Sequence, residues 1–460
     1  MKLSALLLLA AVSTGLSAHT WASTRPHYGG TLRVAVRSAH MPLDPADSSQ
    51  PDSPAARSLS HLMFDTLVIL DARGQPQPAL ATSWRAEPGN QRWQFSIRRG
   101  VTYQDGTVVG PDAVAASLRR GDPTWKVMAT NDAVVIECSL PTPNLPAVLA
   151  LTRYGIAKRS AGKVTGSGPF AISSWDPDKK LSLKARDDYW GGRAFLDAIE
   201  VEFGKSFREL MIMLDLGKAE VVEVPPDQLR LATVQGRRVE SSAPAELMAL
   251  VFRHDRSTAD VDAALDGKLR RAFSLSIDRN SINNVLLQGG SVPTGALLPD
   301  WMTGYAFVFP TSSDMLQAQL LRGEVPQAPA WTLGYDASDS LEKVIGERIA
   351  LNASEAGLRL QPTNSGVSDV RLVRVPLATT DGRIALSSLA TRLELPVPKF
   401  SDDSAYSLYV AENTLLQSQR AIPLLYLRNV VGLSPQVRGW AEDPDGEWRL
   451  ENVWIEVKKP

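Results

Sequence analysis

Short segments in which apolar and polar residues alternate recur along this chain of 460 residues. Alternation with a period of two is typical of half-buried β-strands. We expect such strands over residues 30–36, 93–98, 134–140 and 199–203. Segments whose apolar residues recur with helical spacing lie between strands along the chain. The sequence therefore predicts a mixed α/β (α+β) fold rather than an all-helical or all-strand one.

Three helices can be placed from their apolar spacing and their end signals. Residues 269–276 present one apolar face, and Asp278 then follows as the N-cap of a second helix over residues 279–287. A third helix is expected over residues 341–349, ending near Gly357. Glycine is the residue that most easily adopts the left-handed conformation that ends a helix.

The N-terminus has the pattern of an export signal. Met1 and Lys2 precede an apolar run over residues 3–16, and small residues then allow cleavage after Ala22 or, as a second choice, after Ala18. The run is shorter than the roughly 20 residues that span a bilayer as a helix. We expect residues 1–22 to be a signal peptide and the mature protein to be periplasmic. No cysteine follows the run, so we do not expect a lipoprotein.

Composition excludes several classes of protein. Lys and Arg number 49 against 50 Asp and Glu, and this balance argues against a nucleic-acid binder, which needs a basic surplus. The one cysteine, Cys138, excludes a disulfide framework within the chain, and we expect it to be a buried, unreactive thiol. The five histidines are far apart and lack metal-ligand spacing. We therefore expect no metal site and no cofactor.

One segment matches a catalytic motif. Ser160-Ala161-Gly162-Lys163 has the S-x-x-K pattern of penicillin-recognising acyl enzymes, in which the lysine activates the serine. The companion S-D-N and K-T-G motifs are missing, and Gly162 weakens the helix that this chemistry needs. We expect a protein that is not an enzyme, with a secreted serine acyl enzyme using Ser160 and Lys163 as the less favoured alternative.

Seven segments in a fixed order resemble the family 5 extracellular solute-binding proteins, the peptide, nickel and oligosaccharide receptors of ABC importers. They are Gly29-Gly30-Thr31-Leu32 with Leu43-Asp44-Pro45-Ala46, Phe64-Asp65-Thr66-Leu67-Val68, Pro78-Ala79-Leu80-Ala81-Thr82-Ser83-Trp84, residues 93–107, Gly166-Ser167-Gly168-Pro169-Phe170, Asp188-Tyr189-Trp190-Gly191-Gly192 and residues 269–279. Each segment also has a structural explanation. Asp105-Gly106 is typical of a hairpin turn, and residues 166–169 of a turn into a strand. We expect these segments to build the scaffold and not to contact ligand.

The resemblance implies a three-lobed clamshell with a hinge between lobes I and III. By position, lobe I would comprise residues 28–65, 163–255 and 435–460, lobe II residues 66–162, and lobe III residues 256–434. The lobes would close around a solute, and the closed form would dock on an inner-membrane ABC permease. We expect a monomer that binds a peptide or another small solute and no nucleic acid.

The sequence departs from the family pattern where the ligand would bind. Arg253 follows Phe252 where the family usually has asparagine, and the shortened stretch 375–401 lacks the acidic segment that peptide receptors place near the ligand amine. Only Asp402 and Asp403, just beyond this stretch, could replace the missing carboxylate. Both could also be solvent-exposed residues at the start of a helix. We therefore expect no dedicated amine anchor, and less than about a tenfold loss of affinity when a bound peptide is N-acetylated.

The candidate ligand-binding residues are Arg253, Trp301, Asp402 and Asp403. A peptide is the expected ligand, and a nickel chelate, an oligosaccharide or an opine is the alternative.

Overall fold

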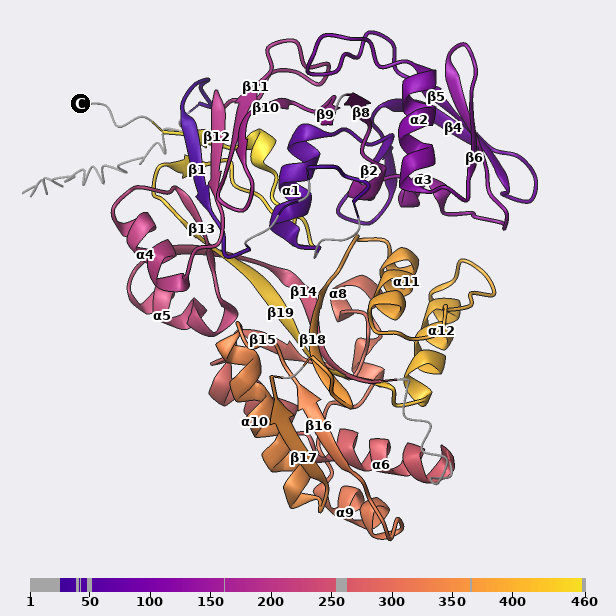
Figure 1. The fold of residues 1–460 in the computed structure, drawn as a ribbon, viewed down its shortest axis with the longest axis vertical. Helices are drawn as coiled ribbons and strands as arrows, with labels where there is room; N and C mark the ends of the chain where they lie inside the picture. Colours follow the sequence, from indigo (N-terminus) through magenta and orange to yellow (C-terminus); the bar gives the residue numbers. More distant parts are fainter. Residues whose placement is uncertain are drawn as a thin grey trace, which may run out of the picture.

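One long sheet joins the two main parts of the molecule. The computed structural model describes residues 25–38, 41, 43–47, 52–160, 162–253, 263–364 and 366–456. The signal-peptide prediction lies outside these residues. Eleven strands form the sheet in the order β10-β11-β12-β1-β13-β19-β14-β18-β16-β17, with β15 paired to β19. Figure 1 shows the sheet passing from a broad upper part into a narrower lower part.

Lobe I is the upper part that contains the first and the last described strands. Its strands are β1 (Thr31–Ala35), β10 (Phe170–Asp176), β11 (Lys180–Ala185), β12 (Ala198–Glu202), β13 (Val221–Val224), β20 (Val437–Arg438) and β21 (Trp454–Ile455), and its helices are α1 (Pro54–Met63), α4 (Phe207–Asp215) and α5 (Leu229–Val234). Leu32 and Val34 of β1 are buried against Ile199 and Val201 of the parallel β12. The alternation in the sequence therefore corresponds to one face in the core.

Lobe II stands beside lobe I and has a core of its own, built from residues between Leu67 and Ile156. Its strands are β2 (Val68–Leu70), β3 (Pro76–Pro78), β4 (Ala81–Ala86), β5 (Arg92–Ile97), β6 (Lys126–Ala129), β7 (Ala133–Glu137), β8 (Ala157–Ser160) and β9 (Lys163–Gly166), and its helices are α2 (Pro111–Gly121) and α3 (Leu145–Val148). A four-stranded sheet, β4-β5-β7-β6, forms its centre.

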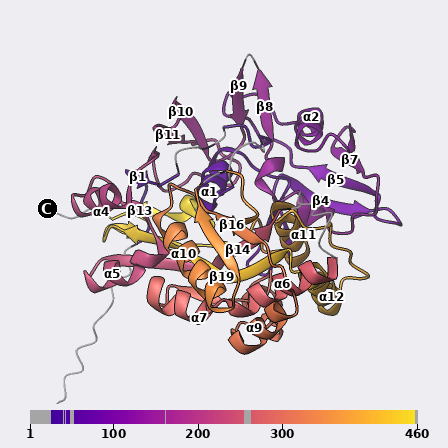
Figure 2. The same cartoon turned by 60° about the horizontal axis from the view of Figure 1, so that its bottom comes forward.

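Lobe III is the lower part, with helices on both faces of the sheet. Its strands are β14 (Arg238–Phe252), β15 (Ser291–Pro293), β16 (Ala330–Gly334), β17 (Arg359–Thr363), β18 (Val370–Pro376) and β19 (Ala421–Leu433), and its helices are α6 (Ala263–Ser276), α7 (Arg279–Ser281), α8 (Asp300–Thr303), α9 (Met315–Gly323), α10 (Ser340–Glu355), α11 (Gly382–Arg392) and α12 (Ala405–Gln417). One core lies under α6, α9 and α10, and a second lies under α8, α11 and α12. Figure 2 shows α6, α9 and α10 in front, away from the strands of lobe II.

The long strands β14 and β19 connect the two parts. Near lobe I, Arg238 pairs with Leu433, and in lobe III Val251 pairs with Ala421. The register shifts between Ser241 and Pro244, between Pro244 and Glu246, and between Met248 and Ala249. A bulge of this kind interrupts the regular pairing and bends the strand locally. A hinge between lobes I and III would lie in these two strands; the hinge and the lobe boundaries, which assign β14 to lobe I, remain predictions.

Most of the predicted elements are confirmed, with one correction. The strand expected over residues 134–140 ends at Glu137, and Leu140 is exposed. Pro141 follows, and a proline has no N–H to continue the pairing. The second helix is α-helical only over Arg279–Ser281 and continues as a π-helical turn over Ile282–Leu286; Asp278 caps it by accepting a hydrogen bond from the Ser281 N–H at 2.9 Å. Cys138 is buried, and burial raises the pKa of its thiol.

Candidate functional site

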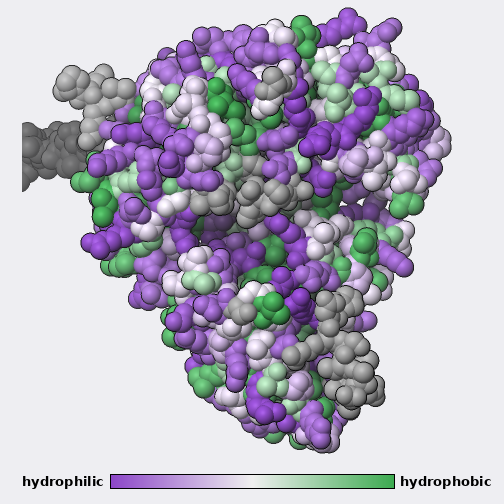
Figure 3. All heavy atoms as spheres, viewed as in Figure 1, coloured by the Kyte–Doolittle hydropathy of each residue, from purple (hydrophilic) through white to green (hydrophobic). Residues whose placement is uncertain are grey.

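A cavity of about 550 Å³ lies where the three lobes meet, and we call it the main chamber. The residues that line it include Ala56 and Ser60 of α1, Thr152 of lobe II, and Ser387, Ser388 and Thr391 of α11. Figure 3 shows the surface hollowed between the upper and lower parts. Arg57, Arg153 and Arg392 also line the main chamber, together with Asp47 and Asp52, so this cavity carries charges of both signs.

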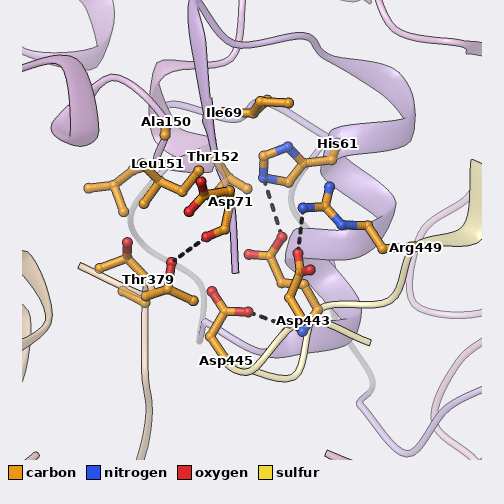
Figure 4. A pocket seen from close by; sticks show the side chains of 14 residues that line it. His61, Ile69, Asp71, Ala150, Leu151, Thr152, Thr379, Asp443, Asp445 and Arg449 are labelled. Atoms are coloured by element: carbon orange, nitrogen blue, oxygen red, sulfur yellow. Dashed lines mark hydrogen bonds and ion pairs between the residues drawn. The ribbon is translucent and has the colours of Figure 1, made fainter. Parts of the chain in front are cut away.

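A smaller cavity of about 50 Å³ adjoins the main chamber, and we call it the side chamber. The two share Leu151, Thr152 and Ala378 as lining residues. Figure 4 shows the side chains of the side chamber, with Asp443, Asp445 and Arg449 on one side and Thr379 on the other.

The lobe III wall of the cavity is electrically neutral at the side chamber. Residues 378–380 follow β18 and contribute Ala378, Thr379 and Thr380. Asp381 comes next, but its carboxylate is used as the N-cap of α11 and accepts the N–H groups of Arg383 and Ile384 at 3.0 and 2.9 Å. This wall therefore offers hydroxyl and methyl groups but no free charge beside the side chamber.

The lobe III wall touches lobe II at one tight point. The Thr380 hydroxyl donates to the backbone oxygen of Asp71 at 3.4 Å. Gly74 has a φ of +73°, and a Cβ there would lie 2.8 Å from the Thr380 carbonyl oxygen. Only glycine suits this turn, because it tolerates the left-handed conformation and leaves room for the opposite backbone.

The lobe I wall, in contrast, is built around a buried arginine. Arg57 of α1 is 3% exposed, and its Nε and Nη1 atoms lie 2.8 Å from Glu447 and 2.9 Å from Asp52. Its Nη2 donates to the backbone oxygen of Asp445 at 3.2 Å. Burial alone would lower the pKa of Arg57, but the nearby carboxylates of Asp52, Glu447 and Asp445 raise it. Arg57 therefore stays charged and ties α1 to the C-terminal segment.

A second arginine completes this charged wall. Arg449 Nη2 lies 2.6 Å from Asp443 Oδ2, and its Nη1 lies 3.8 Å from Glu451 Oε1. His61 Nε2 lies 3.5 Å from Glu447 Oε2. Burial, aided by the positive charge of Arg449, lowers the pKa of His61 to about 4. His61 is therefore neutral at neutral pH and adds no positive charge to the cluster.

Two carboxyl groups in this wall hold protons more tightly than usual. Burial, together with the neighbouring Glu447 carboxylate, raises the pKa of Asp445. Burial also raises the pKa of Glu447, although Arg57 opposes the effect. Burial is the main cause of both shifts; the Glu447 carboxylate adds to it at Asp445, and the Asp443 carboxylate adds to it at Glu447.

The four residues predicted from the sequence do not come together at the cavity. Arg253 is exposed at the end of β14, and its backbone N–H donates to Asp369. Trp301 of α8 donates its Nε1–H to the Pro244 oxygen at 2.8 Å and lines a separate cavity of about 600 Å³ in lobe III. Asp402 and Asp403 are exposed before α12, and Asp403 pairs with Arg383 at 2.7 Å. None of the four lines the main or the side chamber.

The S-x-x-K segment forms a hairpin and not a helix. Ser160 ends β8, Lys163 begins β9, and the two residues pair across the turn. Both are exposed. The helical turn that would bring the lysine nitrogen onto the serine hydroxyl is therefore not present, and Gly162, with a φ of +76°, suits the hairpin turn instead.

The charged wall was not among the sequence-based candidates, although its components are visible in the sequence. Asp443, Asp445, Glu447 and Arg449 alternate with Pro444, Gly446 and Trp448, so four charges occupy seven positions. Arg57 is a charged residue among the buried residues of α1, which is an unusual place for a charge.

Two further properties of the described residues bear on function. No group of three His, Cys, Asp or Glu side chains in the described ranges could hold a metal ion. Within the same ranges, no helix has both the length and the apolar character needed to cross a membrane.

Comparison with known proteins places the chain in a family. Residues 75–364, well over half of the chain, match the family described as bacterial extracellular solute-binding proteins, family 5. One relative, the probable D,D-dipeptide-binding periplasmic protein DdpA of Escherichia coli, is 25% identical over 253 residues, which are 49% of this chain and 48% of the relative. The chain is thus matched to only about half of that protein's length.

Two solved structures share the fold. The periplasmic binding protein DppA of Helicobacter pylori, in complex with the peptide STSA, has a TM-score of 0.79 at 18% identity and covers 94% of this chain and 99% of its own. NikA of Staphylococcus aureus, in complex with Ni(L-His)2, has a TM-score of 0.77 at 15% identity. The match covers 93% of this chain and 100% of the NikA chain. The family match and the three-lobed architecture lead to one conclusion: the chain belongs to the family 5 bacterial extracellular solute-binding proteins.

Proposed function

We propose that the chain is the periplasmic solute-binding subunit of an ABC importer and that its solute is a short peptide. The observation that carries this proposal is the charge distribution of the cavity between the lobes. Charged groups of both signs line the two chambers: the side chamber has carboxyl groups and Arg449, and the main chamber has Asp47 and Asp52 beside three arginines. A peptide has an amine at one end and a carboxylate at the other, so it can pair with charges of both signs in such a cavity. A volume of about 550 Å³ lies within the usual range for small-molecule sites.

The relatives support a peptide and also define the alternative. DdpA is named for D,D-dipeptides, and DppA was solved with the peptide STSA. NikA was solved with Ni(L-His)2, so a metal chelate of an amino acid is a solute of this fold as well. We favour a peptide because its two charged ends can pair with the charges of both signs that line the cavity.

The mechanism follows from the hinge. Lobe III moves relative to lobe I by bending of β14 and β19 near the register shifts at Pro244. The solute binds between the walls and stabilises the closed form, which then docks on the membrane permease. Binding involves no bond cleavage, and the protein would be exported by the segment 1–22.

Native mass spectrometry of protein secreted into rich medium tests the proposed solute. We expect a ladder of adduct masses that corresponds to peptides of several compositions. A single non-peptide mass would replace the peptide by another solute, and covalent labelling of Ser160 by a β-lactam would favour the acyl-enzyme alternative.

A melting experiment tests binding independently. A solute at a hundred times its Kd stabilises the folded state by about 2.7 kcal/mol. We therefore expect casein hydrolysate to raise the melting temperature and a sugar mixture to leave it unchanged. No rise with any hydrolysate would contradict the peptide proposal.

A further inference from the structure

A buried arginine in lobe III has no negatively charged partner among the described residues. Arg279 of α7 is 4% exposed. Its Nε donates to the Pro423 oxygen at 2.9 Å, and its Nη1 donates to the Ser274 oxygen at 3.4 Å. Both acceptors are neutral backbone carbonyls, and Nη2 donates no hydrogen bond to any residue that the structure describes. The positive charge of Arg279 is therefore buried without a counter-charge, which is costly.

Arg57 is buried to a similar degree but differs in its surroundings. The carboxylates of Asp52 and Glu447 lie within 2.9 Å of Arg57 and raise its pKa. At Arg279, burial lowers the pKa to about 10, and no carboxylate in the described part of the chain opposes this effect. Arg279 is still protonated at neutral pH. The protein thus keeps a buried cation here and, unlike at Arg57, does not neutralise it with its own described side chains.

Arg279 lines a cavity of about 440 Å³, which we call the arginine cavity. Residues of α6, α12 and β19 surround it, and Arg271 of α6 supplies a second guanidinium group. No Asp or Glu is among the described residues that line it. Its lining also includes uncharged side chains that can form hydrogen bonds, namely those of Ser274, Ser312, Asn413 and Gln417.

The carboxylates on the neighbouring elements have other roles. Asp266 of α6 pairs with Arg270 at 2.9 Å. Asp278 and Asp314 are the N-caps of α7 and α9, and each accepts a backbone N–H at 2.9 Å. Glu412 of α12 accepts two backbone N–H groups, at 2.6 and 2.9 Å. None of these four carboxylates forms an ion pair with an arginine that lines the cavity, so positive charge is in excess there.

An aromatic cavity adjoins the arginine cavity. It is the cavity of about 600 Å³ that Trp301 lines together with Tyr426 and four prolines, and its one charged lining residue among those described is the exposed Asp300. The two cavities share three lining residues, Phe309, Pro310 and Ser312. A ligand with a charged head at Arg279 can therefore place an apolar body among aromatic side chains.

We propose that the arginine cavity binds the carboxylate of a small organic acid whose apolar body lies in the aromatic cavity. Guanidinium groups bind carboxylates through charge-assisted hydrogen bonds, and the anion would supply the counter-charge that Arg279 lacks. An aromatic ring of the ligand would be buried against Trp301 and Phe309. This second site does not depend on the solute proposed above, because no residue that lines either of its cavities lines the main or the side chamber.

Calorimetry with three small probes tests this site. 3-Phenylpropionate has a carboxylate and a ring, 3-phenylpropionamide has the ring without the charge, and acetate has the carboxylate without the ring. A charge-assisted hydrogen bond corresponds to about 10- to 150-fold in affinity, and burial of a phenyl group to a similar factor. We expect 3-phenylpropionate to bind the unmodified protein about tenfold or more tighter than either other probe. Equal binding of the amide or of acetate, or no binding of 3-phenylpropionate, would overturn the proposal.

Arg279→Met is the decisive variant, because methionine removes the buried charge and keeps an unbranched apolar side chain. We expect the preference for 3-phenylpropionate over its amide to disappear in this variant. The preference should persist in Arg392→Met, which removes a guanidinium group from the main chamber instead. A preference that survives Arg279→Met, or that is lost in Arg392→Met, would overturn the proposal.

Arg271→Asp provides a second test that does not depend on the folding of Arg279→Met. Arg271 is exposed, so reversal of its charge should leave the fold intact. Because a repulsion replaces an attraction, we expect 3-phenylpropionate to bind roughly tenfold more weakly. The matched control is Arg230→Asp on α5, where an exposed arginine lies outside both cavities. Equal affinities of these two variants for 3-phenylpropionate would contradict the proposal.

Discussion

The two walls of the cavity differ in how they are built. The lobe I wall is a buried network in which Arg57 and Arg449 hold the carboxylates of the C-terminal segment. The lobe III wall at the same place consists of Ala378, Thr379 and Thr380, and its nearby Asp381 is used to cap a helix. A charged wall has directional preferences, whereas a neutral wall mainly excludes water and sets the available space. In the proposed function, lobe I would pair with charged groups of the solute, and lobe III would limit the space beside them.

The largest expected difference between the walls is in stability. Arg57→Met would leave the largely buried Glu447 carboxylate, and the partly exposed Asp52, without their cation, and breaking a buried ion pair in this way costs about 3–5 kcal/mol. We expect a loss of that size in the free energy of unfolding, measured by urea denaturation.

Arg392→Met is the matched control on the lobe III side. The Arg392 side chain is 39% exposed and lies 3.8 Å from Asp52, and exposed pairs contribute about 1 kcal/mol or less. Similar losses in both variants would contradict the distinction between a buried and a peripheral charge.

The second prediction concerns the pH dependence of the lobe I wall. The pKa of His61 falls from 6.5 to about 4 on folding, because the charged form is disfavoured by burial. Between these pH values the unfolded chain binds a proton that the folded chain does not, so stability is lost as pH falls from 6.5 to 4. At 1.36 kcal/mol per pH unit, the loss is up to about 3 kcal/mol.

His61→Gln should remove this share of the acid destabilisation. Urea denaturation of both proteins at pH 7 and pH 4.5 measures it. Protonation of Asp445 and Glu447 acts in the opposite direction, because their folded pKa values are raised, and that contribution is common to both proteins. If the free energy of unfolding depended on pH equally in both proteins, His61 would not be the group that destabilises the protein in acid.

The third prediction concerns the tight contact of the lobe III wall. Gly74→Ala places a methyl group 2.8 Å from the Thr380 carbonyl oxygen at a φ of +73°. A left-handed alanine costs roughly 1–2 kcal/mol, and the clash also pushes the lobes apart. We expect weaker solute binding and a larger radius of gyration by X-ray scattering.

Gly89→Ala separates the two effects. Gly89 has a φ of +90°, but nothing lies within 4 Å of a Cβ at this position. It should therefore show the backbone cost without a change in radius or affinity. A radius in Gly74→Ala that equals that of Gly89→Ala would mean that this contact does not limit closure.

The smallest effect is expected from the carboxylates singled out in the sequence. Asp402 and Asp403 are exposed, and the Asp403–Arg383 pair involves a carboxylate that is 81% exposed. Asp402→Asn/Asp403→Asn should change the free energy of unfolding by about 1 kcal/mol or less and leave solute affinity unchanged. A tenfold loss of affinity would show that these two aspartates of lobe III bind the amine of the solute.

The sequence predicted elements better than it predicted the site, for a physical reason. Strand alternation and helix caps depend on residues a few positions apart, and β1, β12 and the Asp278 cap were predictable from such local patterns. The charged wall depends on contacts over a long distance, since Arg57 and Glu447 lie 390 positions apart. No local spacing indicates that they meet, and the carboxylates that sequence position favoured, Asp402 and Asp403, are exposed instead.

The same long separation determines when the binding site can form. Lobe I combines β1 and α1 from the start of the chain with β20 and β21 from its end, and the hydrogen bonds of Arg57 and Ser58 to residues 447 and 448 close the loop between them. Closing a long loop costs more entropy than local pairing, so such contacts form late and slow the folding of the chain. Lobe II, whose core is confined to residues between Leu67 and Ile156, can assemble early. Because residues 447 and 448 complete these contacts, a chain that is still being synthesised cannot form the charged wall before these residues have emerged.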